Sequence, residues 1–193
     1  MTTQPQALAS AQRYHLVSII FHWLIALAFL ANIALGLAFD YVGDANIRLA
    51  IDSHKSLGVL VLVLVAMRIV WRFYCPPPKL PNDMPSLHKN GVHLAHIGLY
   101  ILMIGLPLSG WLHDSAWKAA KDFPMHWFGL FEWPRIAWIA NMEAGAKESF
   151  HSLSGDIHHY LAYVFYGLFA LHVVAAVKHQ ISRSELGKRG MLG

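Results

Sequence analysis

Residues 157–178, IHHYLAYVFYGLFALHVVAAVK, form an almost uninterrupted apolar stretch that decides the fold of this chain. At ~1.5 Å per residue, this stretch is long enough as a helix to cross a membrane core that is ~30 Å thick. It contains His158 and His172, which are fourteen residues apart. Fourteen residues make nearly four helical turns, or ~21 Å, so both side chains lie on about the same face. The stretch therefore predicts a transmembrane helix with one imidazole near each membrane surface.

Three more apolar stretches of similar length precede it, at residues 17–39, 54–73 and 92–111. The chain has 193 residues, of which 56% are hydrophobic and 13% charged, and its mean hydropathy is +0.42. This composition is too apolar for an ordinary soluble domain. The sequence predicts an all-α membrane protein, a four-helix transmembrane bundle in which residues 1–193 form one domain and residues 112–156 form an outer loop.

The charge distribution predicts how the four spans are oriented. An even number of spans puts both termini on one side, which carries nine basic and two acidic residues, or +7. The other side carries six basic and nine acidic residues, or −3, and the two sums give the net charge of +4. The positive-inside rule then places both termini in the cytoplasm. The charged residues of that side are Arg13, Arg68, Arg72, Lys79, Asp83, Lys89, Lys178, Arg183, Glu185, Lys188 and Arg189.

Several function classes are disfavoured by the same composition. The sequence pI is about 9.3, but the basic residues flank span ends, where they contact anionic lipid headgroups rather than nucleic acid. The single cysteine, Cys75, excludes an internal disulfide and a Cys-x-x-Cys-His haem attachment. The tryptophans of residues 112–156 are typical of an interfacial aromatic belt, and a roof over an outer site is the alternative interpretation.

Four histidines fall at matching depths in three of the spans. His22 lies near the cytoplasmic end of the first span and His54 near the outer start of the second. Topology therefore pairs His22 with His172 and His54 with His158. Each pair suits a bis-imidazole haem iron, which favours electron transfer because both axial positions are filled. The alternative is four buried histidines bonded to backbone carbonyls, but two independent matches in depth favour ligation.

Further residues near these levels have two interpretations each. Arg68 follows His54 by fourteen residues and His179 follows His172 by seven, so each shares a face with its partner. Arg68 would neutralise a haem propionate, or Arg68 and His179 would line a quinone site; snorkelling to the interface is the alternative for Arg68. Three other histidines are rivals: His159 for the outer ligand, and His93 and His96 for an inner ligand or a separate metal.

The combined pattern resembles the bacterial cytochrome b561 family of small dihaem membrane cytochromes. The matching motifs are Phe-His-Trp-Leu at 21–24, Ser-His-Lys-Ser-Leu-Gly at 53–58 and His-Leu-Ala-His at 93–96, followed by His158, His172 and His179. The resemblance implies two b-type haems held by two ligands from the last helix and one from each of the first two. It also implies the bacterial inner membrane as location and ubiquinone as redox partner.

The resemblance leaves the electron donor open. The resemblance implies that at least one member of the family is similar to a superoxide oxidase, whereas related dihaem subunits anchor dehydrogenases or hydrogenases to the membrane. The net negative outer side does not attract superoxide, although Lys55, Lys118 and Lys121 offer a local positive patch. A redox protein docked on the outer face is the alternative donor, and a homodimer is also compatible with the sequence. Two other classes, a structural membrane subunit and a metal transporter, predict a protein without haem.

Overall fold

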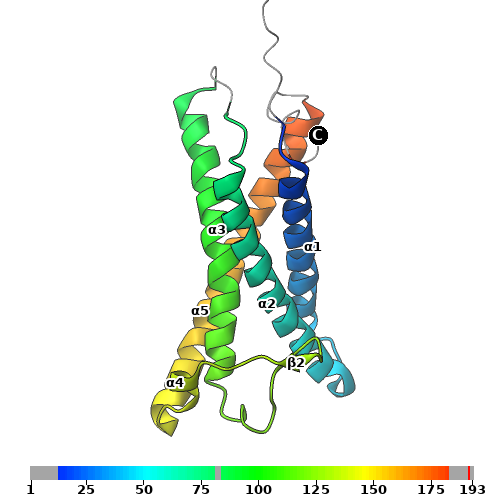
Figure 1. Ribbon diagram of the computed structural model, residues 1–193. Helices are drawn as coiled ribbons and strands as arrows, with labels where there is room; N and C mark the ends of the chain where they lie inside the picture. The colour runs from blue at the N-terminus through cyan, green and yellow to red at the C-terminus, as the bar shows by residue number, and fades with distance from the viewer. Residues whose placement is uncertain (1–12, 81–83, 183–190, 192–193) are drawn as a thin grey trace, which may run out of the picture.

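Four long helices make up most of the structure, a computed structural model that describes residues 13–80, 84–182 and 191. They are α1 (Leu16–Ala38), α2 (Asp44–Tyr74), α3 (Ser86–Ser115) and α5 (Ala144–Ile181). Between α3 and α5 lie a two-stranded antiparallel hairpin, β1 (His126–Trp127) and β2 (Phe131–Glu132), and the short helix α4 (Ala137–Ala140). Each long helix is apolar and long enough to cross a membrane. The predicted four-helix multi-pass architecture is confirmed (Figure 1).

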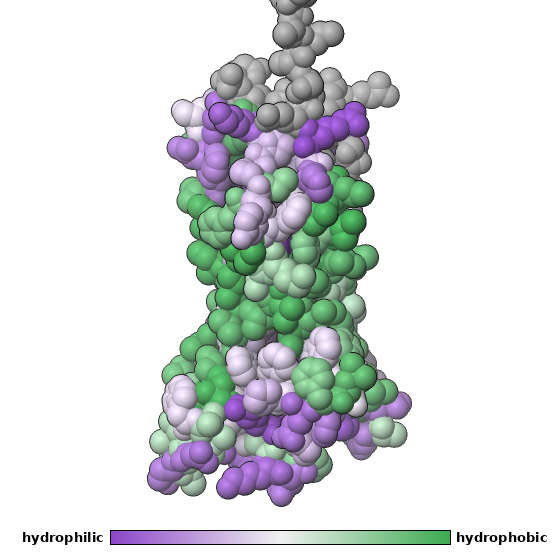
Figure 2. Space-filling view, viewed as in Figure 1, coloured by the Kyte–Doolittle hydropathy of each residue, from purple (hydrophilic) through white to green (hydrophobic). Residues whose placement is uncertain are grey.

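The bundle has two ends of different construction. The terminal end holds the start of α1 and the end of α5, and the hairpin end holds β1, β2 and α4 (Figure 1). A broad apolar belt separates polar surface at the two ends (Figure 2). The hairpin end corresponds to the side predicted to be the outer one. Five charged residues used in that orientation argument, Asp83, Arg183, Glu185, Lys188 and Arg189, lie outside the described residues.

The helices extend beyond the apolar stretches in which they were predicted. Helix α2 begins at Asp44, before the stretch 54–73, and α5 begins at Ala144, before the stretch 157–178. Hydropathy marks the part of a helix that fits the membrane core, whereas caps decide where the helix begins. At α5 the Glu143 side chain accepts hydrogen bonds from the backbone N–H groups of Gly145 and Ala146, at 2.9 and 3.1 Å. Residues 144–156 of the predicted outer loop are therefore an extension of α5.

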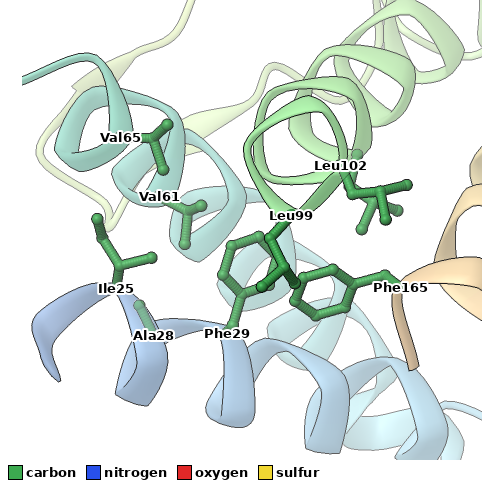
Figure 3. Packing of buried hydrophobic residues seen from close by; sticks show 9 residues of the cluster. Ile25, Ala28, Phe29, Val61, Val65, Leu99, Leu102 and Phe165 are labelled. Carbon is green, nitrogen blue, oxygen red and sulfur yellow. The ribbon is translucent and has the colours of Figure 1, made fainter. Parts of the chain in front are cut away.

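A small apolar core fills the middle of the bundle (Figure 3). Phe29 of α1 stacks on Phe165 of α5 with ring centroids 4.5 Å apart. Phe165 is seven residues from both His158 and His172, so this stack lies midway between the two histidine levels. The core consists of Ile25, Ala28, Phe29, Val61, Val65, Leu99, Leu102, Leu106 and Phe165.

Helix packing leaves α5 attached mainly to one neighbour. Helix α3 packs along α5, α1 packs along α2, and α2 packs along α3. Within the described residues, neither α1 nor α2 packs its backbone closely along α5. Side chains therefore span the distance from α5 to α1 and α2, and the histidine pairs are among them.

Candidate haem-binding sites

Two histidine pairs face each other across the bundle at different depths. The ring centroids of His54 on α2 and His158 on α5 are 6.2 Å apart. Those of His22 on α1 and His172 on α5 are also 6.2 Å apart. For two imidazoles that bind one metal ion from opposite sides, metal–nitrogen distances of ~2 Å and nitrogen-to-centroid distances of ~1.1 Å place the centroids ~6.2 Å apart. Both pairs therefore fit a bis-imidazole iron site.

The hairpin-end pair has its imidazole orientation fixed by the backbone. Nδ1 of His54 donates to the carbonyl oxygen of Asn32 at 3.1 Å. Nδ1 of His158 donates to the carbonyl oxygen of Leu106 at 3.1 Å and to Ser109 Oγ at 2.9 Å. A carbonyl only accepts, so Nδ1 carries the proton in both rings and Nε2 keeps its lone pair for a metal.

Two glycines let these rings approach the neighbouring helices. A Cβ atom at Gly36 would lie 3.4 Å from Cε1 of His54, and one at Gly110 would lie 3.3 Å from Cε1 of His158. Each glycine follows the accepting residue by four positions, Asn32 before Gly36 and Leu106 before Gly110. In a helix, such residues lie one above the other on the same face. The missing side chain thus exposes the carbonyl that the histidine uses.

The terminal-end pair has different surroundings. Within the described part of the chain, no hydrogen bond involves a ring nitrogen of His22 or His172. A third ring, His96 of α3, has its centroid 5.8 Å from that of His172. These three rings do not form a three-ligand metal site in the described residues. His96 is therefore a neighbour of the pair. In the sequence, its position near the start of the third span placed it at the depth of this pair.

The remaining rival histidines lie elsewhere. His159 is exposed, with its ring centroid 6.4 Å from that of His158. Nδ1 of His93 donates to the carbonyl of Lys89 on its own helix, at 2.7 Å. The structure thus brings together the two pairs chosen by depth, and neither of these two histidines takes the place of a member of a pair.

Arg68 lies at the terminal end in a polar cluster. Its Nε donates to the hydroxyl of Tyr100 at 3.0 Å, and the Arg72 guanidinium lies 5.7 Å from the Tyr100 ring centroid. Burial raises the pKa of Tyr14, which keeps its phenol neutral beside the arginines. Among the described residues, no carboxylate forms an ion pair with Arg68 or Arg72. A small pocket here is lined by Tyr14, Ser18, Arg68, Arg72, Cys75, Pro77, Tyr100 and Met191.

His179, the other residue predicted near this level, lies in the last turn of α5. The described lining of the Arg68 pocket comes from the segment before α1, from α1, α2 and α3, and from the segment after α2, together with Met191. The structure therefore brings Arg68 and the terminal-end histidines to one region but does not join His179 to that pocket.

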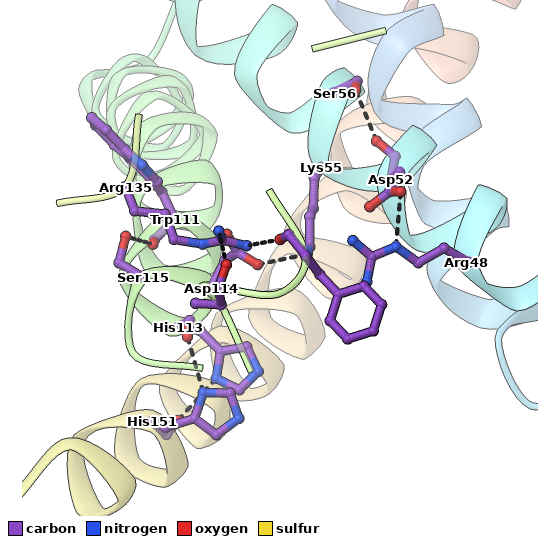
Figure 4. Close-up of polar contacts among 12 residues, drawn as sticks. Arg48, Asp52, Lys55, Ser56, Trp111, His113, Asp114, Ser115, Arg135 and His151 are labelled. Atoms are coloured by element: carbon purple, nitrogen blue, oxygen red, sulfur yellow. Dashed lines mark hydrogen bonds and ion pairs between the residues drawn. The ribbon is translucent and has the colours of Figure 1, made fainter. Parts of the chain in front are cut away.

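An ion cluster at the hairpin end was missed by the sequence analysis (Figure 4). The Asp114 carboxylate bridges Lys55 Nζ at 2.5 Å and Arg135 Nε at 2.9 Å. Arg135 also donates to the carbonyls of Ala120 and Phe123. The cluster joins α2, α3 and the loop next to His54. An acidic residue three positions after the apolar stretch 92–111 was the available signal, but its partners are distant in sequence.

The loop before α4 is fastened to the same part of α2. Trp127 Nε1 donates to the carbonyl of Ser56 at 3.1 Å, and the backbone N–H of Phe128 donates to Ser56 Oγ at 3.0 Å. Ser56 is buried and lies two residues after His54. The aromatic residues of this loop thus contact the helix that carries a histidine of the hairpin-end pair.

Comparison with known proteins agrees with this arrangement. The family described as "Prokaryotic cytochrome b561" matches residues 13–193. The chain is 32% identical over 186 residues to "Cytochrome b561 homolog 2" of Escherichia coli (strain K12), covering 94% of this chain and 92% of that protein. It is 33% identical over 135 residues to "Probable superoxide oxidase CybB" of Yersinia pestis, covering 65% of each. "Cytochrome b561 homolog 1" of Escherichia coli (strain K12) is 25% identical over 143 residues, 74% of each.

The match to the family covers nearly the whole chain, including all four long helices and both histidine pairs. The histidine geometry also fits the b-type haem that the family name implies, since the single cysteine leaves coordination as the means of attachment. The chain belongs to the prokaryotic cytochrome b561 family of membrane-embedded b-type cytochromes.

Proposed function

We propose that the chain binds two b-type haems and carries electrons across the bacterial inner membrane between a donor on the outer face and the quinone pool. His22 and His172 would hold one haem, and His54 and His158 the other. The haem iron supplies the one-electron chemistry, while the protein supplies position, potential and exclusion of water.

One observation carries this proposal. Two pairs of imidazoles have the spacing expected of two ligands to one iron, and α5 supplies one histidine to each pair. These two histidines of α5, His158 and His172, are fourteen residues apart, so the pairs lie ~21 Å apart along the helix axis. This separation places one pair toward each end of the apolar belt. Histidines buried only for packing have no reason to occur twice at the same spacing.

The residues between and around the pairs have separate tasks. The Phe29–Phe165 stack and its apolar neighbours keep the middle of the bundle free of water. Arg68 would neutralise a propionate of the terminal-end haem or bind a quinone headgroup, and His179, in the last turn of α5, would contribute to the surroundings of that headgroup from outside the Arg68 pocket. The half-buried polar cluster of Arg68 and Tyr100 favours an anionic or carbonyl-bearing group there.

The electron donor is proposed by similarity. The relative from Yersinia pestis is named a probable superoxide oxidase, which makes superoxide the first donor to test and ubiquinone the first acceptor. With both termini in the cytoplasm, the hairpin end faces outward and the donor would approach over the loop that contains Trp127. A redox protein docked on this face is the alternative donor.

The proposal is tested by a dithionite-reduced minus oxidised spectrum of the protein purified in mild detergent, with haem measured per polypeptide. Two low-spin b-type haems per chain are expected. A second assay follows the reduction of a soluble ubiquinone analogue on addition of superoxide. A protein with one haem, or none, from cells able to supply haem would contradict the two-haem proposal.

A further inference from the structure

Ser109 on α3 contacts a histidine of the hairpin-end pair, and this contact distinguishes that pair from the terminal-end pair. Ser109 is 5% exposed. Its hydroxyl donates to the carbonyl of Leu106 at 2.8 Å and accepts from Nδ1 of His158 at 2.9 Å. A buried hydroxyl with both its donor and an acceptor position in use has a fixed orientation. Ser109 therefore offers Nδ1 of His158 an acceptor in a fixed direction.

We propose that Ser109 is a positioning residue of the hairpin-end haem. With the Leu106 carbonyl it holds the Nδ1–H group of His158, and it keeps the midpoint potential of this haem below that of the terminal-end haem. The inference rests on the two-haem function proposed above and deepens it, because it states which of the two sites more readily gives up its electron.

The physical reason lies in the donor strength of the imidazole. When Nδ1–H donates to an oxygen, electron density on Nε2 increases and the ring becomes a stronger ligand. A stronger neutral ligand stabilises the more positive, ferric iron and lowers the potential. Both hairpin-end rings have such a bond, and His158 has two acceptors for its proton. Within the described residues, His22 and His172 have none.

Nearby charges act in the same direction. Arg68, close enough to interact with both terminal-end histidines, has no carboxylate partner in the described part of the chain. Its positive charge favours the reduced state of a haem at this end. At the hairpin end, Lys55 beside His54 shares the Asp114 carboxylate with Arg135, at 2.5 and 2.9 Å. This cluster therefore keeps one net positive charge, against two for Arg68 and Arg72 at the terminal end. Hydrogen bonding thus lowers the midpoint potential of the hairpin-end haem, and charge raises that of the terminal-end haem.

The adjacent residue explains why a serine can act at this position. Gly110 has no side chain, and a Cβ there would lie 3.3 Å from Cε1 of His158. The ring therefore approaches close enough for Ser109 Oγ to reach Nδ1. Ser109 supplies the second acceptor and Gly110 the space, so each can be changed separately.

The test is a redox titration of the haem-loaded protein in detergent, comparing wild type with Ser109→Ala. The lower of the two midpoint potentials should rise and the higher should stay unchanged. His22→Ala, which would retain only the hairpin-end haem, identifies which transition belongs to that site. The ferric low-spin EPR signal of the hairpin-end haem should shift together with its potential.

Three further variants separate positioning from a general structural effect. Ser109→Thr keeps the hydroxyl and should restore the wild-type potential. Ser109→Cys keeps the volume with a weaker acceptor and should give a smaller rise, which also provides the answer where Ser109→Ala fails to fold. Ser154→Ala removes a buried hydroxyl of α5 that donates only to carbonyls of its own helix, and it should move neither potential.

The outcomes distinguish this inference from the function on which it rests. Two haems with a lower potential that stays the same in Ser109→Ala, or that belongs to the terminal-end site, would overturn the inference and leave the proposed function intact. A wild-type protein without two haems would overturn both. A rise confined to the hairpin-end haem, reversed by Ser109→Thr, would support it.

Discussion

The two ends of the bundle each hold a pair of facing imidazoles, but in different surroundings. At the hairpin end, His54 and His158 lie against glycines and donate to backbone carbonyls. At the terminal end, His22 and His172 have a third imidazole nearby, that of His96, and an arginine. The hairpin end is thus built to hold its rings in one orientation, and the terminal end to place polar groups around them.

This difference shows how one fold can give two chemically similar sites different properties. The centroid spacing is 6.2 Å in both pairs, so ligand geometry does not distinguish them. What differs is the set of groups that contact the ligands, and such groups tune potential and affinity. The predictions below test this contrast, beginning with the largest expected effect.

Removal of one ligand should separate the two sites completely. His158→Ala should remove the hairpin-end haem and His172→Ala the terminal-end haem, each leaving about half of the wild-type haem per polypeptide. Pyridine haemochrome quantification measures the loss. His159→Ala is the control, because His159 neighbours His158 but is exposed, and it should retain both haems. Loss of both haems from either ligand variant would show that the sites do not form independently.

Removal of the Asp114 carboxylate should weaken only the hairpin end. Asp114→Asn leaves Lys55 and Arg135 without their shared partner, and their side chains are only 19% and 11% exposed. Leaving buried cations unpaired costs about 3 kcal/mol. We expect a lower thermal unfolding temperature in detergent, with the hairpin-end haem lost before the other.

The matched control for Asp114 is Asp52→Asn. Asp52 pairs with Arg48 one turn along the same helix, and both side chains are at least one third exposed. A surface pair of this kind contributes less than about 1 kcal/mol, so unfolding should be almost unchanged. Equal effects of the two substitutions would contradict the assignment of Asp114 as the buried centre of the cluster.

Replacement of Arg68 should change only the terminal end. Arg68→Leu removes a positive charge that favours a reduced haem there, so the higher midpoint potential should fall, by an amount equivalent to roughly 1 kcal/mol. Quinone reduction should slow as well. Unchanged values of both the potential and the turnover would contradict the role proposed for Arg68. Lys79→Leu, an exposed residue after α2, is a control for loss of charge on this side.

The smallest effect is expected where α5 begins, beyond both histidine pairs. Backbone N–H groups of Gly145 and Ala146 hold the pKa of Glu143 below its ordinary value. The cap therefore stabilises the first turn of α5 at pH values above the unfolded pKa of Glu, about 4.3, and this stabilisation is lost as the pH falls through the folded pKa. Glu143→Ala should speed amide exchange in this turn at neutral pH, with no change in haem content. Glu148→Ala is the matched control.

Both the four helices and the two histidine pairs could be predicted from sequence for one physical reason. A membrane core has a fixed thickness, so long apolar stretches mark the spans, and the position of a histidine within a span gives its depth. Depth and helix direction together leave few partners for His158 and His172. The ends of the helices were less predictable, because caps such as Glu143 lie outside the apolar stretches.

The neighbours of the histidines were decided only by tertiary structure. Gly36 and Gly110 resemble other small residues of the spans until the helices pack, and Ser109 acts on a ring 49 positions away in sequence. The same holds for Asp114, which lies 59 and 21 positions from its two partners. The sequence by itself determined the spans, their number and the depth of each paired histidine, because the bilayer constrains one dimension. Rotation of each helix about its axis, and hence which carbonyl, hydroxyl or charge contacts each imidazole, follows from side-chain packing between helices and was decided by the tertiary structure alone.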